Sequence, residues 1–367
     1  GVQTCALPIY IHLSLDYDDK SVRKAVAQQL RIEEKSIKSC KIFRRSVDAR
    51  KKDNIYFLTT VDAELNINED KVCKKCGNAQ IARKYEYNQM KFGNAPSPIV
   101  VGAGPAGLFA ALILARSGAN PILIERGRDV DRRTADVNRF WTSGKLDITS
   151  NVQFGEGGAG TFSDGKLNSG TKDIRQRKVL EEFVSHGAPD EILYNAKPHI
   201  GTDMLKGTIK NIRNEIIELG GMVMFETKLV SMAFSDNKLK SITVETANGD
   251  EIIETDNVIL AIGHSARDTF EMLYDLKLPI EAKPFSVGAR IEHLRQKVDK
   301  AQYGRFAGNK KLGSANYKLS THLDNGRGVY TFCMCPGGKV VNASSEENRL
   351  CTNGMSEFAR NAENSNS

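Results

Sequence analysis

The chain has 367 residues, 40% of them apolar and 26% charged, which excludes a disordered or fibrous protein and predicts a globular protein of two or three domains. Its formal net charge is +7, and residues 1–95 carry most of the excess, with 18 Lys and Arg against 12 Asp and Glu. Because no aromatic residues are interleaved with these basic ones, we expect a solvated basic surface and no nucleic-acid partner.

The cysteines and the apolar segments indicate where the protein works. The seven cysteines follow no dense, regular spacing, so we expect a reducing, cytoplasmic setting. Residues 98–115 carry no charge, but three glycines and two prolines interrupt them. We therefore predict no membrane segment and no signal peptide.

The N-terminal part predicts a small α+β module. The first nine residues, GVQTCALPI, match the in-frame translation of a common sequencing-library adapter, so we expect residues 1–9 to be adapter-derived rather than native. The next segments read as strand, helix, strand and strand, at 11–15, 19–30, 37–47 and 55–65. This order predicts a ferredoxin-like module over residues 10–90. The polar residues 66–96, which end in NAPSP, are predicted to be a linker.

A complete β-α-β unit follows. An apolar strand at 98–101 leads into the glycines of VVGAGPAG, a helix begins at Pro105, and the strand PILIE ends at Glu125. Gly102 permits the tight turn, Gly104 lets the backbone approach a pyrophosphate, and Gly107 lets helix and strand pack closely. The amides at the start of this helix are predicted to bind the phosphates.

Glu125 indicates which dinucleotide binds. It lies 23 residues after Gly102, where a carboxylate accepts hydrogen bonds from the ribose hydroxyls of the adenosine half. A carboxylate disfavours a ribose 2′-phosphate at that point. The spacing therefore predicts FAD or NAD rather than NADP.

A second G-x-G-x-x-G pattern, in FGEGGAGTFSDGKL, lacks this context. No buried strand precedes Gly155, no apolar helix is expected after Gly160, and no strand-terminal acid follows. We interpret it as a glycine-rich loop that covers a flavin ring or a substrate, with Ser163, Asp164 and Lys166 as its polar groups. The alternative is a surface loop without a ligand.

The rest of the chain continues the α/β pattern. Leucines and isoleucines at helical spacing over 205–219 predict an amphipathic helix that ends at Gly220, and short strands are predicted at 223–227, 229–234, 239–246 and 257–263. Cys333 and Cys335 would share one face of a strand, and we interpret them as a buried, inert pair, with a redox pair as the alternative. No histidines or cysteines have the spacing of a complete metal site, so no metal is expected.

Together these motifs resemble a known family. VVGAGPAGLFAAL, LIERG, GEGGAGTFSDGKL, VILAIGHSARDTFEML, PFSVGARIEH and VYTFCMCPGG are similar, in this order, to the FAD-dependent dehydrogenases of the glutathione-reductase-type flavoproteins. The resemblance implies an α/β fold with a Rossmann-type FAD-binding domain over 97–284 and a substrate domain over 285–367. The late Gly-Asp motif that closes the flavin site in such proteins is absent after Gly328, so we expect an incomplete substrate domain and weakened FAD binding.

The resemblance and the motifs also give a set of site residues. The expected cofactor-binding residues are Gly102, Gly104, Pro105, Ala106, Gly107, Glu125, Arg126, Gly157, Gly158, Gly160, Val230 and Gly263. Val230 stands for a backbone contact near the adenine, and Gly263 marks the return of the chain to the FAD domain. Lys166 and Asp164 are the candidate catalytic residues.

The predicted function is that of an FAD-dependent oxidoreductase. It would pass a hydride or electrons between a small-molecule substrate, or NAD(P)H as a transient donor, and an acceptor that the sequence does not identify. A first alternative is an NAD-dependent dehydrogenase with a single Rossmann unit. A second alternative is a nucleic-acid-binding protein in which the basic N-terminal module is the active part and FAD is structural or regulatory.

Overall fold

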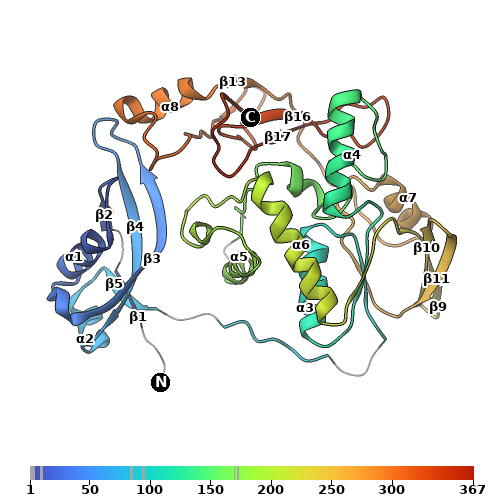
Figure 1. Ribbon diagram of the computed structural model, residues 1–367, viewed down its shortest axis with the longest axis horizontal. Helices are drawn as coiled ribbons and strands as arrows, with labels where there is room; N and C mark the ends of the chain where they lie inside the picture. The colour runs from blue at the N-terminus through green and yellow to red at the C-terminus, as the bar shows by residue number, and fades with distance from the viewer. Residues whose placement is uncertain (1–4, 9–10, 83–85, 93–95, 169, 172) are drawn as a thin grey trace.

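The computed structural model describes residues 5–8, 11–82, 86–92, 96–168, 170–171 and 173–367. A small α+β module lies at one end of the molecule, a parallel sheet with its helices lies at the other, and the C-terminal residues connect the two along one side (Figure 1). Among the described residues, no helix is long and apolar enough to cross a membrane.

The N-terminal module has the complete ferredoxin-like order of elements. These are β1 (Cys5–Pro8), β2 (Ile11–Leu13), α1 (Asp19–Leu30), β3 (Ile37–Asp48), β4 (Tyr56–Leu65), α2 (Glu69–Lys75) and β5 (Ala79–Ala82), with a 3₁₀ turn, η1 (Glu34–Ser36), before β3. Helix α1 begins where predicted because the Asp18 carboxylate accepts a hydrogen bond from the Ser21 amide. Its apolar face, with Val22 and Val26, is buried against the sheet.

Strands β1 and β2 pair one after the other with the same side of β4. Ala6 lies opposite Ala63, and Ile11 lies opposite Thr59, so both strands run antiparallel to β4 in nearly the same register. Strand β5 pairs with the other side of β1, and β3 pairs with the other side of β4. The resulting order, β5, β1 with β2, β4, β3, is antiparallel throughout.

Two expectations for this region need correction. Residues 66–82 are not a linker, because they form α2 and β5, which complete the module. Residues 5–8 belong to the segment that we expect to be adapter-derived. They nevertheless form β1 and pair with β4 and β5. The fold does not test the origin of residues 1–9, so their derivation from an adapter stays a prediction.

The second region confirms the predicted α/β class. Strands β6 (Ile99–Val101), β7 (Ile122–Ile124), β8 (Met222–Met224) and β12 (Val258–Leu260) form a parallel sheet in the order β12, β6, β7, β8. Helices α3 (Pro105–Arg116) and α6 (Thr202–Glu218) pack on the face that carries Val100 and Leu123. The antiparallel strands β9 (Lys228–Ser235), β10 (Lys238–Thr246) and β11 (Gly249–Glu254), with α7 (Arg267–Asp275), cover the opposite face.

Between β7 and α6 the chain forms α4 (Val130–Ser143), the 3₁₀ helix η2 (Gly158–Phe162), α5 (Arg175–Ser185) and η3 (Asp190–Leu193). The C-terminal residues form β13 (Glu292–Leu294), α8 (Arg295–Tyr303), η4 (Gly304–Phe306), β14 (Ser320–His322), β15 (Gly328–Tyr330), β16 (Lys339–Asn342), β17 (Thr352–Met355) and β18 (Asn364–Asn366). These strands form three antiparallel pairs, β13 with β18, β14 with β15 and β16 with β17.

The C-terminal region packs directly against α4 and η2. Val341 and Met355 share a buried cluster with Phe162, and the Trp141 indole donates a hydrogen bond of 2.8 Å to the Asn342 carbonyl. The ring of Trp141 also meets that of Phe162 edge to face. This contact brings the loop after the second glycine pattern against residues almost 200 positions later in the chain.

Candidate functional site

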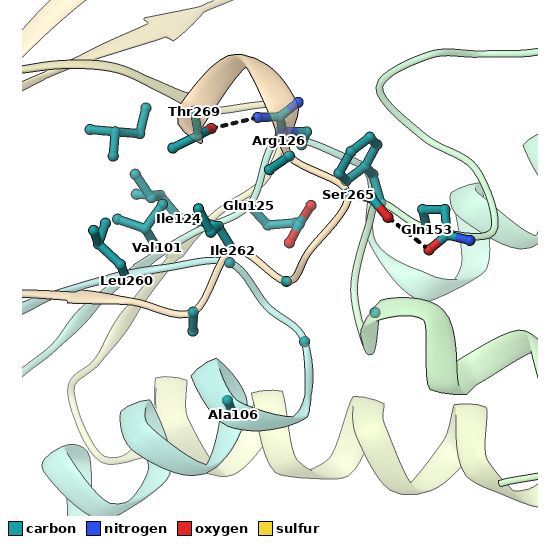
Figure 2. A pocket seen from close by; sticks show the side chains of 18 of the residues that line it. Val101, Ala106, Ile124, Glu125, Arg126, Gln153, Leu260, Ile262, Ser265 and Thr269 are labelled. Atoms are coloured by element: carbon teal, nitrogen blue, oxygen red, sulfur yellow. Dashed lines mark hydrogen bonds between the residues drawn. The ribbon is translucent and has the colours of Figure 1, made fainter. Parts of the chain in front are cut away.

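A cavity of about 510 Å³ opens at the carboxyl ends of β6, β7 and β12, within the size range of ligand pockets (Figure 2). Most of the predicted cofactor-binding residues line it, namely Gly102, Gly104, Pro105, Ala106, Glu125, Arg126, Gly158 and Gly263. The described residues that line the cavity do not include Gly107, Gly157, Gly160 or Val230. Near the predicted adenine contact, the neighbouring Lys228 and Leu229 line the cavity instead of Val230.

The first glycine pattern forms the floor of this cavity. Gly102 has a φ of +99°, and a Cβ there would come within 2.5 Å of the Ala261 carbonyl oxygen that follows β12. A Cβ on Gly107 would lie 1.8 Å from the Gly102 carbonyl oxygen. Both positions therefore require glycine for the fold itself.

Gly104 differs from these two, because the protein leaves room for a side chain there. A Cβ at Gly104 would meet only the Cα of Gly158, at 3.9 Å, and the backbone has an ordinary φ of −71°. No side chain caps the first turn of α3, and Ala106 in that turn is exposed. The first amides of the helix are thus available to an anion in the cavity.

Glu125 has a structural role that the sequence did not predict. One carboxylate oxygen accepts a hydrogen bond of 2.8 Å from the Ala103 amide. The other accepts from the Gly127 amide at 2.9 Å and the Gly155 amide at 3.0 Å. The carboxylate is 6% exposed and joins the first glycine pattern to the second. The spacing predicts that Glu125 accepts a hydrogen bond from a ribose hydroxyl. Such a bond would have to use the same two carboxylate oxygens that accept from the three amides.

The second glycine pattern is a closely fitted loop, and it lies against the first. The Gly157 amide donates to the Ala103 carbonyl at 2.8 Å, and a Cβ on Gly158 would stand 3.1 Å from the Gly104 Cα. As expected, no apolar α-helix directly follows Gly160, and the loop contains only the short 3₁₀ helix η2. Gly155, Gly157 and Gly158 all have positive φ, whereas Gly160 does not.

Arg133 of α4 holds this loop, and sequence reasoning missed it. Its guanidinium is fully buried and donates to the carbonyl oxygens of five loop residues, namely Asn151, Val152, Gly155, Glu156 and Gly158, at 2.5 to 3.3 Å. It also stacks over the Phe162 ring at 4.9 Å. Burial lowers the pKa of Arg133 to about 10, while Glu125 and Glu156 oppose that shift. The group therefore stays charged at neutral pH.

Arg126 lies at one side of the cavity, where Figure 2 shows it beside Thr269. Its guanidinium bonds Asp268 at 2.9 Å and the Thr269 hydroxyl at 3.0 Å, and it covers the Phe154 ring at 4.6 Å. Burial would raise the pKa of Asp268, but Arg126 and Lys228 together lower it well below its usual range. This ion-paired edge of the cavity is polar, and Ile124 of β7 and Leu260 of β12 line the cavity with apolar side chains.

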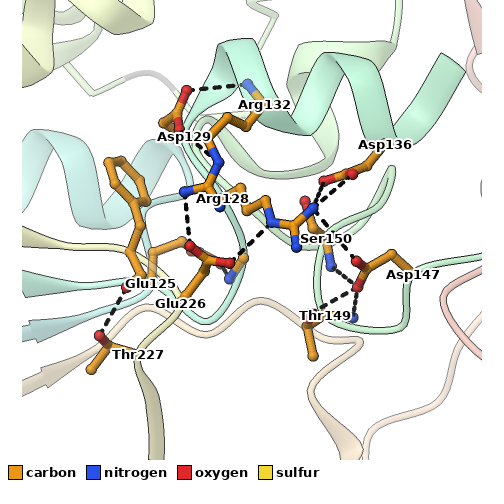
Figure 3. A network of polar contacts seen from close by, with 12 residues as sticks. Glu125, Arg128, Asp129, Arg132, Asp136, Asp147, Thr149, Ser150, Glu226 and Thr227 are labelled. Atoms are coloured by element: carbon orange, nitrogen blue, oxygen red, sulfur yellow. Dashed lines mark hydrogen bonds and ion pairs between the residues drawn. The ribbon is translucent and has the colours of Figure 1, made fainter. Parts of the chain in front are cut away.

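A charged network fixes the loops behind the cavity (Figure 3). Arg128 bonds Asp136 of α4 at 2.8 Å and Glu226, after β8, at 3.0 Å. Arg132 bonds the other oxygen of Glu226 at 2.8 Å. Because Glu226 precedes Thr227, whose amide donates to the Glu125 carbonyl, the network ties the start of α4 to the strand ends around the cavity.

The two candidate catalytic residues lie beyond the cavity lining, in an ion-pair cluster around the buried Asp164. Asp164 is 1% exposed and pairs with Lys166 at 3.1 Å, while Arg360 and the Ser356 hydroxyl also donate to it. Burial would raise the pKa of Asp164, but Arg360 and Lys166 lower it below its usual value. Asp164 is thus suited to positioning Lys166. The catalytic role of either residue stays a prediction.

Comparison with known proteins identifies the family. The model of an FAD binding domain matches residues 97–136, and that of an "FAD-dependent protein, C-terminal domain-like" matches residues 284–367. A domain of unknown function matches residues 8–64. An uncharacterized protein of Clostridium beijerinckii is 47% identical over 363 residues, which are 97% of this chain and 67% of the relative.

Solved structures with a local likeness include flavoproteins. Thermovibrio ammonificans THI4 is 16% identical with a TM-score of 0.31, and the match covers 50% of this chain and 64% of that one. A flavoprotein/dehydrogenase from Cytophaga hutchinsonii is 18% identical with a TM-score of 0.33, covering 55% of this chain and 46% of that one. This chain thus spans less than two thirds of each of these solved chains.

Proposed function

Because this chain belongs to the family of FAD-dependent oxidoreductases, we propose that the cavity at β6, β7 and β12 binds FAD and that the whole protein uses it to oxidise or reduce a small molecule. The observation that carries the proposal is the uncapped start of α3 beside Gly104, which opens on that cavity. Bound FAD would supply the hydride or electron transfer chemistry.

The residues around the start of α3 fit a pyrophosphate. Gly104 leaves a space that any side chain would fill, and the first-turn amides of α3 offer donors with the positive end of the helix dipole. Gly158 faces Gly104 and limits the space from the second glycine pattern. The phosphates would therefore lie between the two glycine patterns.

The adenosine half fits the opposite side of the cavity, toward Arg126 and β9. Leu229 and the backbone of Lys228 line that side, and Arg126 is held in place by Asp268. A guanidinium fixed in this way offers a flat cationic surface to an adenine ring. Glu125 would accept from the ribose through the lone pairs that its three amide bonds leave free.

The electron donor of this function is either NAD(P)H, bound transiently, or an organic substrate. Among the described residues that line the cavity, two α-helices begin without a side-chain cap, α3 and α7, and the start of α3 is assigned to FAD. In this proposal a nicotinamide would bind transiently at the exposed face of the flavin. A cytoplasmic location, expected from the cysteine pattern, remains part of the proposal.

The test places a negative charge where the phosphates would lie. In Ala106→Asp a carboxylate enters the first turn of α3, where it stabilises a free helix but repels an anion. We expect FAD affinity, measured by quenching of flavin fluorescence, to fall by about tenfold or more, which is about 1.4 kcal/mol. The free energy of unfolding without FAD should stay equal or rise. Ala135→Asp adds the same charge to an exposed position of α4 and should leave FAD affinity unchanged.

Two results would overturn the proposal. One is equal FAD affinity in the Ala106→Asp variant and the unaltered chain, which would remove the phosphate site from α3. The other is that the unaltered chain takes up no FAD but is stabilised by NAD, which would favour the NAD-dependent alternative. If NADH or NADPH bleaches the absorbance of the bound flavin under anaerobic conditions, that nicotinamide is the electron donor. If neither bleaches it, the electron donor is an organic substrate.

A further inference from the structure

Cys333 and Cys335 form a compact cluster with Lys166, which follows the second glycine pattern in the chain. The Lys166 ammonium nitrogen lies 3.4 Å from the Cys335 sulfur and 3.9 Å from the Cys333 sulfur, so one cation contacts both thiols. Asp164 in turn holds Lys166 at 3.1 Å. From the sequence we expect an inert pair, but the contact of Lys166 with both thiols argues against that expectation.

The backbone brings the two sulfurs toward the same point. Cys333 has a φ of +50°, a left-handed conformation that is uncommon for a residue other than glycine. Through this bend the Cys335 sulfur comes within 3.3 Å of the Cys333 carbonyl oxygen, to which its thiol donates. Arg290 bonds that carbonyl from the other side, at 3.4 Å.

The surroundings of the two thiols shift their pKa values in opposite directions. The neighbouring Cys335 thiol lowers the pKa of the Cys333 thiol, burial opposes this, and Lys166 and Arg290 lower it further. The pKa of Cys335 is raised by Cys333 and by burial. Cys333 is half-buried, whereas Cys335 is fully buried. Cys333 is therefore the accessible thiolate, and Cys335 is the protonated thiol behind it.

The chain contains a second pair of nearby cysteines with the opposite setting. Cys73 and Cys76 lie at the end of α2, where burial and the carboxylates of Glu69 and Asp70 raise the pKa of Cys73. The Cys76 thiol donates to the Gln29 carbonyl at 3.2 Å. No cation is among the groups that shift the pKa of Cys73, so this pair serves as an internal control.

We propose that Cys333 and Cys335 are a redox-active dithiol, in which Cys333 attacks a low-molecular-weight disulfide and Cys335 then closes an intramolecular disulfide. In the first step the Cys333 sulfur bonds one sulfur of the reagent, the reagent's S–S bond breaks, and one thiolate leaves. In the second step Cys335 loses its proton and attacks the Cys333 sulfur, and the second thiolate leaves. The dithiol loses two electrons and two protons overall, and the reagent gains them as two thiols.

Lys166 has a positioning role in this chemistry. Its ammonium stabilises the Cys333 thiolate and then the thiolate that Cys335 must become before the second attack. Asp164, which faces the same cluster, is paired with Arg360 as well as with Lys166, and it raises the pKa of Cys335 by less than Lys166 lowers it. The proposal is independent of FAD, because it uses only groups of this chain and an external disulfide.

The test uses the unaltered chain and oxidised glutathione. Cleavage after Arg327 and Lys339 releases the peptide 328–339, which holds both cysteines. After exposure to oxidised glutathione at pH 7 and alkylation of the remaining thiols, we expect this peptide unalkylated and two hydrogen atoms lighter, with reversal by dithiothreitol. The Cys335→Ser variant should instead keep glutathione bound at Cys333, and the Cys333→Ser variant should give neither product. Cys73 should react more slowly than Cys333 at this pH.

The pH profile distinguishes positioning by Lys166 from simple packing. Alkylation of Cys333 in the unaltered chain should stay fast as pH falls below the ordinary cysteine value of about 8.5, and slow only near its lowered pKa. In Lys166→Met this fall in rate should move to a higher pH by about one unit of pKa, while the rate at pH 10 stays the same. The proposal is overturned if peptide 328–339 remains fully alkylated while the exposed Cys351 takes up glutathione, or if Cys333 reacts no faster than Cys73 at pH 7.

Discussion

Two stretches of this chain share the pattern G-x-G-x-x-G, at 102–107 and 155–160, yet glycine is needed for different reasons in each. In the first, Gly102 and Gly107 are required because strand and helix pack too closely for a Cβ, and Gly104 faces the cavity. In the second, the glycines at 155, 157 and 158 take backbone angles that other residues avoid, and the loop wraps around Arg133. The same pattern thus lines an open cavity in one place and forms a closely fitted loop in the other.

The strongest test of this difference is Gly107→Ala in the first pattern. Its Cβ would collide with the Gly102 carbonyl oxygen at 1.8 Å, and backbone atoms cannot move aside as a side chain can. We expect the free energy of unfolding to fall by about 4 kcal/mol or more, measured by urea denaturation. Gly207→Ala in α6 is the matched control, since no atom lies within 4 Å of its Cβ; it should raise stability by about 0.5–1 kcal/mol. Equal stability of the two variants would contradict the packing argument.

In the second pattern the largest effect is expected from Arg133→Met. The apolar side chain has a similar length but leaves the five loop carbonyls without their buried donor. We expect a loss of about 3 kcal/mol in the free energy of unfolding and faster proteolysis within residues 151–162. Arg133→Lys should recover part of this loss, because an ammonium group can serve some of the same carbonyls. A loop that resists proteolysis in the methionine variant would mean that the glycines, not Arg133, determine its conformation.

The contrast also explains what the sequence could and could not predict. The first pattern was predicted correctly as strand, turn and helix because the apolar run, the glycine turn and Pro105 at the helix start all lie within residues 98–107. The role of Arg133 could not be predicted from the sequence, because its five acceptors are backbone carbonyls 18 or more residues away. Helix α2 was missed because it has seven residues and only Val72 as a buried apolar side chain. The contact of Lys166 with Cys335 spans 169 positions, beyond any local pattern.

Gly104→Ala separates the ligand from the fold within the first pattern. The methyl group would meet only the Gly158 Cα at 3.9 Å, so the free energy of unfolding without FAD should change by less than about 0.5 kcal/mol. FAD affinity should nevertheless fall about tenfold, because the methyl group occupies the space given to the pyrophosphate. Fluorescence titration and urea denaturation of the same preparation measure both. A loss of stability with unchanged FAD affinity would reverse the roles assigned to Gly104 and to Gly107.

Gly160→Ala should have the smallest effect, although Gly160 is the third glycine of its pattern as Gly107 is of the first. Nothing lies within 4 Å of a Cβ at Gly160, and its φ is not positive. We expect urea denaturation to show a change within about 0.5 kcal/mol, and FAD affinity to stay the same. Gly157→Ala, three residues earlier, should cost about 2 kcal/mol because φ is +84° and the methyl group would meet Thr161 at 2.1 Å. If Gly160→Ala were as harmful as Gly157→Ala, the third glycine would have a function that only a bound ligand could explain, since the protein leaves its side-chain position open.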